Sequence, residues 1–450
     1  MKRAISLASF LSVVSILAFV SAQSREEATK LLQQYVAIDT SNPPGDTRKA
    51  ADFLASIFER EQIPVTRYES APGKSIVYAR LKATAAPPAG KAIVLLHHMD
   101  VVPADRAQWK TDPFKPTIKK GDAGDEMWAR GAFDMKGQGV AQILAFLELK
   151  RRRVPLTRDV ILLAEPDEEV GGAMGARWMI ANHYAELDPE YVIDEGGVGS
   201  PDLFAPGKLV YGISVAEKKI VWLKVRAEGV SGHGSQPNDQ NPNDRLMKAL
   251  ARLLADGGPE RPAPRSSIVD VMRANIGAFA QNKFTNAIQR STIALTWLRS
   301  GVGEPPKINV IPSIAEAGLD CRVLPGTSKD HWMEEVRRRL GDPSLKLELI
   351  NESDDPIVTP HDTPLYRNLE AAIKHVHAGA IVTPILVPYG TDSNAFRPKG
   401  VKSYGIFPAS VSAEAVASMH GDAERAPLDA VAEAAEVLFE ALGKTAGDGR

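Results

Sequence analysis

Residues 92–100 read Ala92-Ile93-Val94-Leu95-Leu96-His97-His98-Met99-Asp100, so an apolar segment runs directly into two imidazoles and a carboxylate. An apolar run of this kind is typical of a buried parallel strand, whose carboxyl end opens onto a cleft. Since residues two apart on a strand point the same way, His98 and Asp100 share a face and His97 points away. The pair predicts a metal-ligating imidazole beside a carboxylate that orients it; an ordinary structural histidine is the alternative.

Further segments along the chain also end in acids. The strand-like residues 159–164 lead into Glu165-Pro166-Asp167-Glu168-Glu169, and residues 191–193 lead into Asp194-Glu195. Asp134 stands between a strand-like segment and a helix expected over residues 138–153. A solvated acidic loop and a helix N-cap are the alternative interpretations of these acids. Together with His420 in the last part of the chain, they predict a polar cluster along one sheet edge.

Composition restricts the class of protein. A chain of 450 residues exceeds what one hydrophobic core usually serves, so two domains are expected. The net charge of −2 gives no support to a nucleic-acid partner. Lys2 and Arg3 precede an apolar run that ends in small residues at Ala22, which predicts a cleaved signal peptide over residues 1–22. The protein is then expected to be secreted or periplasmic, without stable membrane association after cleavage; an uncleaved membrane anchor is the alternative. The single cysteine, Cys321, predicts a buried, inert thiol.

The hydrophobic periodicity divides the chain into two kinds of structure. Residues 23–213 and 354–450 predict an α/β catalytic domain with a mostly parallel sheet covered by helices. Residues 214–353 predict an inserted α+β domain, because their strand and helix patterns follow the order βαββαβ of the ferredoxin-like fold. Its expected strands cover residues 218–227, 291–298, 315–323 and 345–350, and its expected helices cover residues 243–255 and 331–340.

The collected candidates are histidines and carboxylates, with almost no cysteine. This inventory favours a catalytic zinc pair over a structural zinc site, which usually draws on thiolates. Two metal ions about 3.5–4 Å apart need a bridging carboxylate. Asp134 is the natural bridge.

Seven ordered motifs span nearly all of the chain after residue 22. They are His98-x-Asp100-Val101-Val102-Pro103, Arg130-Gly131-x-x-Asp134-Met135-Lys136-Gly137, Asp167-Glu168-Glu169-x-Gly171, Asp194-Glu195-Gly196, Asn309-Val310-Ile311-Pro312, Asp320-x-Arg322-x-x-Pro325-Gly326 and His420-Gly421. In this set the sequence resembles the dinuclear zinc metallopeptidases, which include glutamate carboxypeptidase, carboxypeptidase S, aminoacylase and acetylornithine deacetylase. The form of the motifs is most similar to the carboxypeptidase S and aminoacylase branch.

The resemblance implies two zinc ions, which cobalt or manganese can replace. It places His98 and Glu195 on one ion and Glu169 and His420 on the other, with Asp134 bridging both. Asp194 is the alternative to Glu195, because only one of these neighbours can be the terminal ligand. Asp100 would orient His98. Glu168 would be the general base that activates a metal-bridging hydroxide and later protonates the leaving amine, a task that suits a carboxylate whose pKa is raised.

The resemblance also assigns the inserted domain the role of a lid. The lid histidine His233 would stabilise the oxyanion, often from the other subunit of a homodimer. Asn309 and Arg322 would bind the substrate carboxylate, for which the planar guanidinium is well suited. Gly390 and Thr391 would line the same pocket.

These features predict a secreted zinc hydrolase that cleaves a peptide or N-acyl amino acid bond next to a free carboxylate. The expected partner is a small-molecule or short-peptide substrate. An aminopeptidase of related fold and a catalytically inactive binding protein are the alternatives. Which side chain and acyl group the substrate carries depends on loop shapes that one sequence does not determine.

Overall fold

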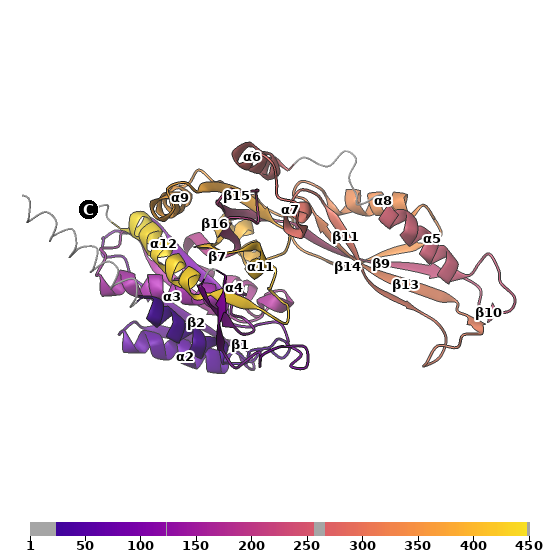
Figure 1. Ribbon diagram of the computed structural model, residues 1–450, viewed down its shortest axis with the longest axis horizontal. Helices are drawn as coiled ribbons and strands as arrows, with labels where there is room; N and C mark the ends of the chain where they lie inside the picture. Colours follow the sequence, from indigo (N-terminus) through magenta and orange to yellow (C-terminus); the bar gives the residue numbers. More distant parts are fainter. Residues whose placement is uncertain (1–23, 123, 256–265, 448–450) are drawn as a thin grey trace, which may run out of the picture.

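The computed structural model describes residues 24–122, 124–255 and 266–447 (Figure 1). The predicted signal peptide, residues 1–22, lies outside the described residues. Within the described ranges, no helix combines the length and the apolar character that crossing a membrane requires.

The larger of two units is built on an eight-stranded sheet. Its strand order is β1 (Val65–Ala71), β2 (Lys74–Leu81), β6 (Val160–Glu165), β3 (Ala92–His98), β7 (Pro189–Ser200), β16 (Lys402–Ser410), β8 (Val210–Glu217) and β15 (Ile381–Val387). The four strands β6, β3, β7 and β16 run parallel to their neighbours in this group, so the predicted α/β class with a mostly parallel sheet is confirmed. The opening apolar segment of the sequence is the fully buried β3.

Both faces of this sheet are covered, as a continuous apolar strand requires. On β3, Ile93 and Leu95 belong to the core beneath helices α3 (Lys136–Arg151) and α12 (Leu428–Ala446). The alternate residues Val94 and Leu96 pack on the other face, against α4 (Ala176–Leu187). A helix over residues 24–36, α2 (Arg48–Arg60) and α9 (Pro364–Val376) complete the first layer. The strand ends therefore form the free edge of a three-layer structure.

The smaller unit is an antiparallel sheet in the order β11 (Thr292–Ser300), β13 (Ile314–Val323), β9 (Lys219–Glu228) and β14 (Lys346–Glu352). Helices α5 (Pro242–Ala255) and α8 (Lys329–Leu340) cover one face and share a separate core with it. This arrangement is the predicted ferredoxin-like lid. Figure 1 shows the lid projecting from the larger unit, with the short strand β10 (Gly232–His233) at its far end.

Two features depart from the range 214–353 expected for the inserted domain. Strand β8 continues in the main sheet to Glu217, where it pairs with Val387. Helices α6 (Ser267–Ile276) and α7 (Lys283–Ile288) return to the larger unit, where Met272 joins its core. The Phe284 ring of α7 lies edge-on against Phe204. This return was not predicted, because the apolar faces of these helices look the same whichever core they join.

The sequence pattern also missed several elements that carry little periodicity of their own. These are the hairpin of β4 (Thr117–Gly121) and β5 (Gly124–Trp128), the added strand β17 (Arg425–Pro427), helix α4 and strand β15. Strand β17 matters for the site, since it places the segment after His420 beside the segment before Asp134.

Candidate metal centre

The carboxyl end of β3 delivers His98 to the free edge of the sheet, where its side chain is only 1% exposed. Its Nδ1 atom lies 2.8 Å from the backbone carbonyl oxygen of Asp100, which assigns the ring proton to Nδ1. Its Nε2 atom then presents a lone pair to the Oδ1 atom of Asp134 at 3.2 Å. Two acceptor atoms at this distance require a proton or a cation between them, as expected of two ligands to one metal ion.

Asp134 offers one carboxylate oxygen to each of two imidazoles. Its Oδ1 atom faces His98, and its Oδ2 atom lies 3.1 Å from Nε2 of His420. Glu169 completes the second group, with Oε2 at 3.3 Å from the same nitrogen of His420. Asp134 precedes α3 and makes no side-chain bond at its N-cap, so the alternative interpretation as a capping residue is not observed. The arrangement is that of a carboxylate bridging two metal positions.

Glu195 and Asp194 point in different directions at the end of the neighbouring strand β7. Glu195 places Oε1 3.9 Å from Nε2 of His98. The Oδ2 atom of Asp194 instead accepts hydrogen bonds from the backbone N–H and the hydroxyl of Ser393, both at 2.8 Å. The Asp194 carboxylate is thereby directed away from His98, toward the short helix α10 (Ser393–Phe396).

We call the group of His98, Asp134 and Glu195 the inner position, and the group of Asp134, Glu169 and His420 the outer position. Ligand atoms of His98, Glu168 and Glu195 lie within 4.8 Å of one another, and so do those of His98, Asp134 and Glu169. Imidazoles and carboxylates without a thiolate suit zinc, manganese or cobalt in a catalytic site.

The electrostatics of the cluster also demand positive charge. Burial, followed by the nearby Glu195, raises the pKa of Glu168 well above its ordinary value, and burial with Asp134 does the same for Glu195. Hydrogen bonds to Asp134 and Glu169 raise the pKa of His420 to about 10. Without metal, the carboxylates hold protons on themselves and on imidazole. Divalent cations can supply the same compensation.

Glu168 lies in a short 3-10 turn, η1 (Glu168–Val170), that follows β6 rather than on a strand. Its backbone N–H donates to Oδ1 of Asp100 at 3.3 Å. The Oδ2 atom of Asp100 accepts from the Asn42 side chain at 2.8 Å. The carboxylate of Asp100 thus lies 3.7 Å from Nδ1 of His98, farther than its own backbone carbonyl, and anchors the turn that carries Glu168.

Two residues predicted from the lid lie at its far tip. His233 is in β10, paired with β12 (Val310–Ile311), and the backbone N–H of Gly234 donates to the carbonyl of Asn309 at 2.8 Å. Both His233 and Asn309 are exposed. Figure 1 places β10 at the end of the lid remote from the main sheet, so within one chain the structure does not bring His233 to the metal centre.

Arg322, Gly390 and Thr391 lie at the base of the lid instead. Arg322 pairs with Ile220 across β9 and β13, and a Cβ at Gly390 would lie 3.6 Å from the Ile220 side chain. The guanidinium of Arg322 makes two contacts to Asp320, at 2.8 and 3.2 Å. The Thr391 hydroxyl and N–H both donate to Glu217 at 2.9 Å, so this side chain holds its loop in place.

A small apolar pocket of about 20 Å³ opens beside the inner position. Its walls come from residues flanking three candidate ligands and from the returning helix α7: Phe133, Met135, Val198, Leu203, Phe204, Phe284, Phe407, Val416 and Met419. Glu195 and Tyr389 stand among them, and the Tyr389 hydroxyl donates to the carbonyl of Gly196 at 3.1 Å. Tyr389 was not predicted, although it directly precedes the predicted pocket residues Gly390 and Thr391.

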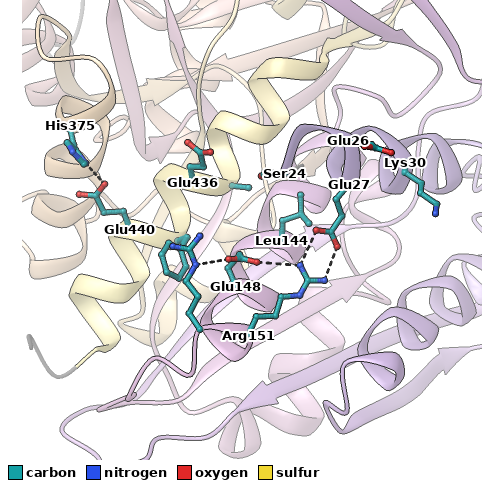
Figure 2. Close-up of a pocket in the computed structure, with 13 residues that line it drawn as sticks. Ser24, Glu26, Glu27, Lys30, Leu144, Glu148, Arg151, His375, Glu436 and Glu440 are labelled. Atoms are coloured by element: carbon teal, nitrogen blue, oxygen red, sulfur yellow. Dashed lines mark hydrogen bonds and ion pairs between the residues drawn. The ribbon is translucent and has the colours of Figure 1, made fainter. Parts of the chain in front are cut away.

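A larger hollow, of about 1080 Å³, lies elsewhere, between the helix over residues 24–36, α3 and α12 (Figure 2). Figure 2 shows its walls occupied by ion pairs, among them Arg151 with Glu27 at 2.8 Å and His375 with Glu440 at 2.7 Å. It contains none of the candidate site residues, and several of its charged groups pair with one another. We therefore assign it no part in the chemistry.

The chain is similar in sequence to known proteins over most of its length. The model of "Peptidase family M20/M25/M40" matches residues 94–444. The chain is 26% identical to the N-fatty-acyl-amino acid synthase/hydrolase of Mus musculus, over 92% of this chain and 86% of the relative. It is 27% identical to aminoacylase-1 of Dictyostelium discoideum, over 86% and 90% of the two chains.

Solved structures share the fold. The M20 family metallo-carboxypeptidase of Sulfolobus solfataricus matches with a TM-score of 0.69 at 20% identity, over 93% of this chain and 98% of that one. A Bacillus subtilis structure described as a dinuclear metal binding peptidase from the M20 family matches with a TM-score of 0.60 at 14% identity, over 94% and 99%.

Proposed function

Because the chain belongs to peptidase family M20/M25/M40, and is thus a metallohydrolase, we propose that it is a zinc-dependent amidohydrolase that cleaves an N-acyl amino acid or peptide bond next to a free carboxylate. The observation that carries this proposal is the position of Asp134, whose two oxygens face His98 and His420 at 3.2 and 3.1 Å. The donor set fits two ions, with Glu195 rather than Asp194 as the remaining ligand of the inner position. When bound, such ions polarise the scissile carbonyl and acidify water.

Glu168 is the group positioned to move the proton. Its carboxyl lies within 4.8 Å of ligand atoms of His98 and Glu195, while Asp134 is the carboxylate that lies between His98 and His420. Burial among carboxylates favours its protonated form, so a proton taken from the attacking water can be held at a Glu168 oxygen and released to the leaving amine. The Asp100 carboxylate holds the turn that aims it.

Arg322 is proposed to bind the substrate carboxylate. Its side chain is 24% exposed at the base of the lid, next to the loop that contains Gly390. Asp320 neutralises part of its charge and fixes the plane of its guanidinium, which still has donors to offer to a second carboxylate.

The apolar lining beside Glu195 favours an acyl group over a free amine on the other side of the scissile bond, although the pocket itself, about 20 Å³, has room only for a water-sized group. A free N-terminus would need carboxylates or carbonyl oxygens around it. Among the described residues that line this pocket, Glu195 is the only carboxylate, and it is already a metal-ligand candidate. An acylase or carboxypeptidase therefore fits better than an aminopeptidase.

The position of His233 at the lid tip supports a homodimer. An exposed imidazole that lies away from its own metal centre can complete the site of a second copy when two lids pair. We propose that His233 and Asn309 act across such an interface. We further propose, from the sequence of residues 1–22 alone, that the protein is exported.

The test is hydrolysis by the full chain, loaded with zinc, of a matched panel of substrates. The panel contains N-acetyl and longer N-acyl amino acids, the same compounds with the carboxylate amidated, and aminoacyl amides with a free amine. We expect cleavage of the N-acyl amino acids and a fall in kcat/KM of at least about 10-fold on amidation, since the Arg322 guanidinium loses its charged partner. Preferred cleavage of aminoacyl amides would instead identify an aminopeptidase.

A further inference from the structure

Glu424 lies four residues after His420 and has no role so far. Its side chain is fully buried, and its carboxylate accepts four hydrogen bonds from one loop. Oε1 accepts the backbone N–H groups of Phe133 and Asp134 at 2.9 and 3.0 Å. Oε2 accepts the N–H of Gly131 at 3.0 Å and Nη1 of Arg130 at 2.7 Å. One carboxylate thus organises the backbone that presents Asp134.

Arg130 connects this carboxylate to the other half of the site. While Nη1 binds Glu424, Nη2 donates to the backbone carbonyl of His420 at 3.3 Å. The guanidinium is 2% exposed and lies 5.1 Å above the Trp109 ring, which restricts it further. The loop of Asp134 and the loop of His420 are distant in sequence, and Arg130 and Glu424 link them directly.

The two metal positions differ in how much they need this link. In the inner position, His98 lies at the end of a buried strand, and its ring is fixed by the Asp100 carbonyl. In the outer position, His420 belongs to no helix or strand, its φ is +61°, and its side chain is 54% exposed. The hydrogen bond from the Arg130 side chain to its backbone carbonyl therefore helps to hold His420 in place.

We propose that Glu424 and Arg130 form a positioning clamp that sets the metal affinity of the outer position, while touching neither metal nor substrate. The proposal rests on the two-metal centre of the proposed function. Loss of the clamp releases His420 and tilts the Asp134 loop, so the outer position loses its ion first. The inner position keeps His98 and Glu195 and retains its ion.

The charge of Glu424 is essential to this role, because its two oxygens accept four donors. In Glu424→Gln the shape is retained, but the amide NH₂ must face two of those donors. This leaves N–H groups of the loop without an acceptor and Arg130 without a counter-ion. Groups that orient metal ligands typically contribute about 10 to 100-fold to metal affinity, which is the effect we expect at the outer position.

The experiment is titration of metal-free full-length protein with Zn²⁺ by calorimetry and with Co²⁺ by visible absorption, with no substrate present. We expect two binding events in the wild type. We assign the weaker event to the outer position and the tighter event to the inner position. In Glu424→Gln we expect the affinity of the outer position to fall by about 10 to 100-fold, while that of the inner position stays unchanged. Arg130→Lys keeps the positive charge but loses the second Nη donor, which binds the His420 carbonyl, so it should weaken the same binding event to a smaller degree.

Glu217→Gln is the matched control. Glu217 is an equally buried carboxylate, 3% exposed, paired with Arg397 and with Thr391 on a different loop. It should lower the thermal midpoint without changing either metal-binding event. If Glu424→Gln leaves both events unchanged, as Glu217→Gln does, or weakens both in parallel, the clamp proposal is wrong.

Should Glu424→Gln fail to fold, Arg130→Lys decides, since it retains the backbone bonds of Glu424. Substrate turnover is not part of the readout. A protein that binds two ions in the expected way but cleaves no N-acyl amino acid would therefore contradict the proposed function and leave the clamp standing.

Discussion

The Nδ1 atom of His98 lies 2.8 Å from the backbone carbonyl oxygen of Asp100 and 3.7 Å from its carboxylate. The backbone, and not the side chain, is therefore the nearer group that fixes the imidazole tautomer. The carboxylate contacts the Glu168 backbone and the Asn42 amide instead. Asp100 therefore orients His98 through its backbone and anchors the Glu168 turn through its side chain, whereas the sequence predicted only that its carboxylate orients His98.

Asp100→Asn should consequently affect turnover more than metal binding. The carbonyl that orients His98 remains, so zinc affinity should stay within a few-fold of wild type. The turn of Glu168 loses a charged anchor, and we expect kcat to fall by about 10 to 100-fold. Steady-state kinetics and zinc titration of the same preparation measure both quantities. Loss of zinc from the variant would show that the carboxylate itself orients the ligand.

Glu168→Gln should abolish proton transfer and leave the fold intact. The amide occupies the same volume beside Glu195 but cannot take a proton from water. We expect kcat to fall by at least about 100-fold, with zinc content and the thermal midpoint unchanged. Near-wild-type turnover in this variant would remove Glu168 from the role of general base.

Complementation tests whether His233 acts across a dimer. Glu168→Gln and His233→Ala should each be inactive alone. Coexpressed, half of the dimers are mixed, and one of their two sites combines an intact Glu168 with an intact His233. About a quarter of wild-type activity should return. If the mixture stays inactive although size-exclusion chromatography shows dimers, His233 has no role across the interface.

His97 should make the stability of the metal-free protein depend on pH. Burial lowers its pKa to about 3, whereas an unfolded histidine titrates near about 6.5. Between these values the unfolded chain binds a proton that the native chain does not. The free energy of unfolding therefore falls as the pH decreases below about 6.5, by up to about 1.4 kcal/mol per pH unit from this group.

The matched variant is His97→Gln, which removes the titration and leaves the other acids in place. Urea unfolding at several pH values should show a shallower fall in stability for this variant than for wild type. The variant also loses the hydrogen bond between His97 and Gln142, so its free energy of unfolding should be lower by a constant amount at high pH. This constant difference does not affect the slope with pH. Identical slopes in the two proteins would contradict the buried, neutral state of His97.

Cys321 should be unreactive until the lid unfolds. It is fully buried in the lid core, and burial raises the pKa of its thiol to about 12. At about pH 8 almost no thiolate is present, so a disulfide reagent should not label the native protein. In denaturant one thiol per chain should react. Rapid labelling of the folded protein would indicate that the lid core opens.

Much of the centre was already present in the order of residues. Apolar runs that end at His98, Glu165 and Asp194 identify strand ends, and the strand ends of a parallel sheet share one edge. The ferredoxin-like lid followed from the same kind of pattern. These predictions succeed because the period of a strand and the chemistry of a ligand are both local properties.

Other features of the site depend on contacts between segments that are distant in the sequence, and only the tertiary structure determines them. Asp194 turns away because Ser393 offers it two donors, and Glu424 becomes a support of Asp134 only because β17 pairs with β5. The return of α6 and α7 to the main core, and the placement of His233 at the lid tip, follow from packing that no single segment encodes. The sequence by itself determined which side chains are able to bind metal; the tertiary structure decided which of them face one another, because a side chain's partner depends on the neighbour that the fold supplies.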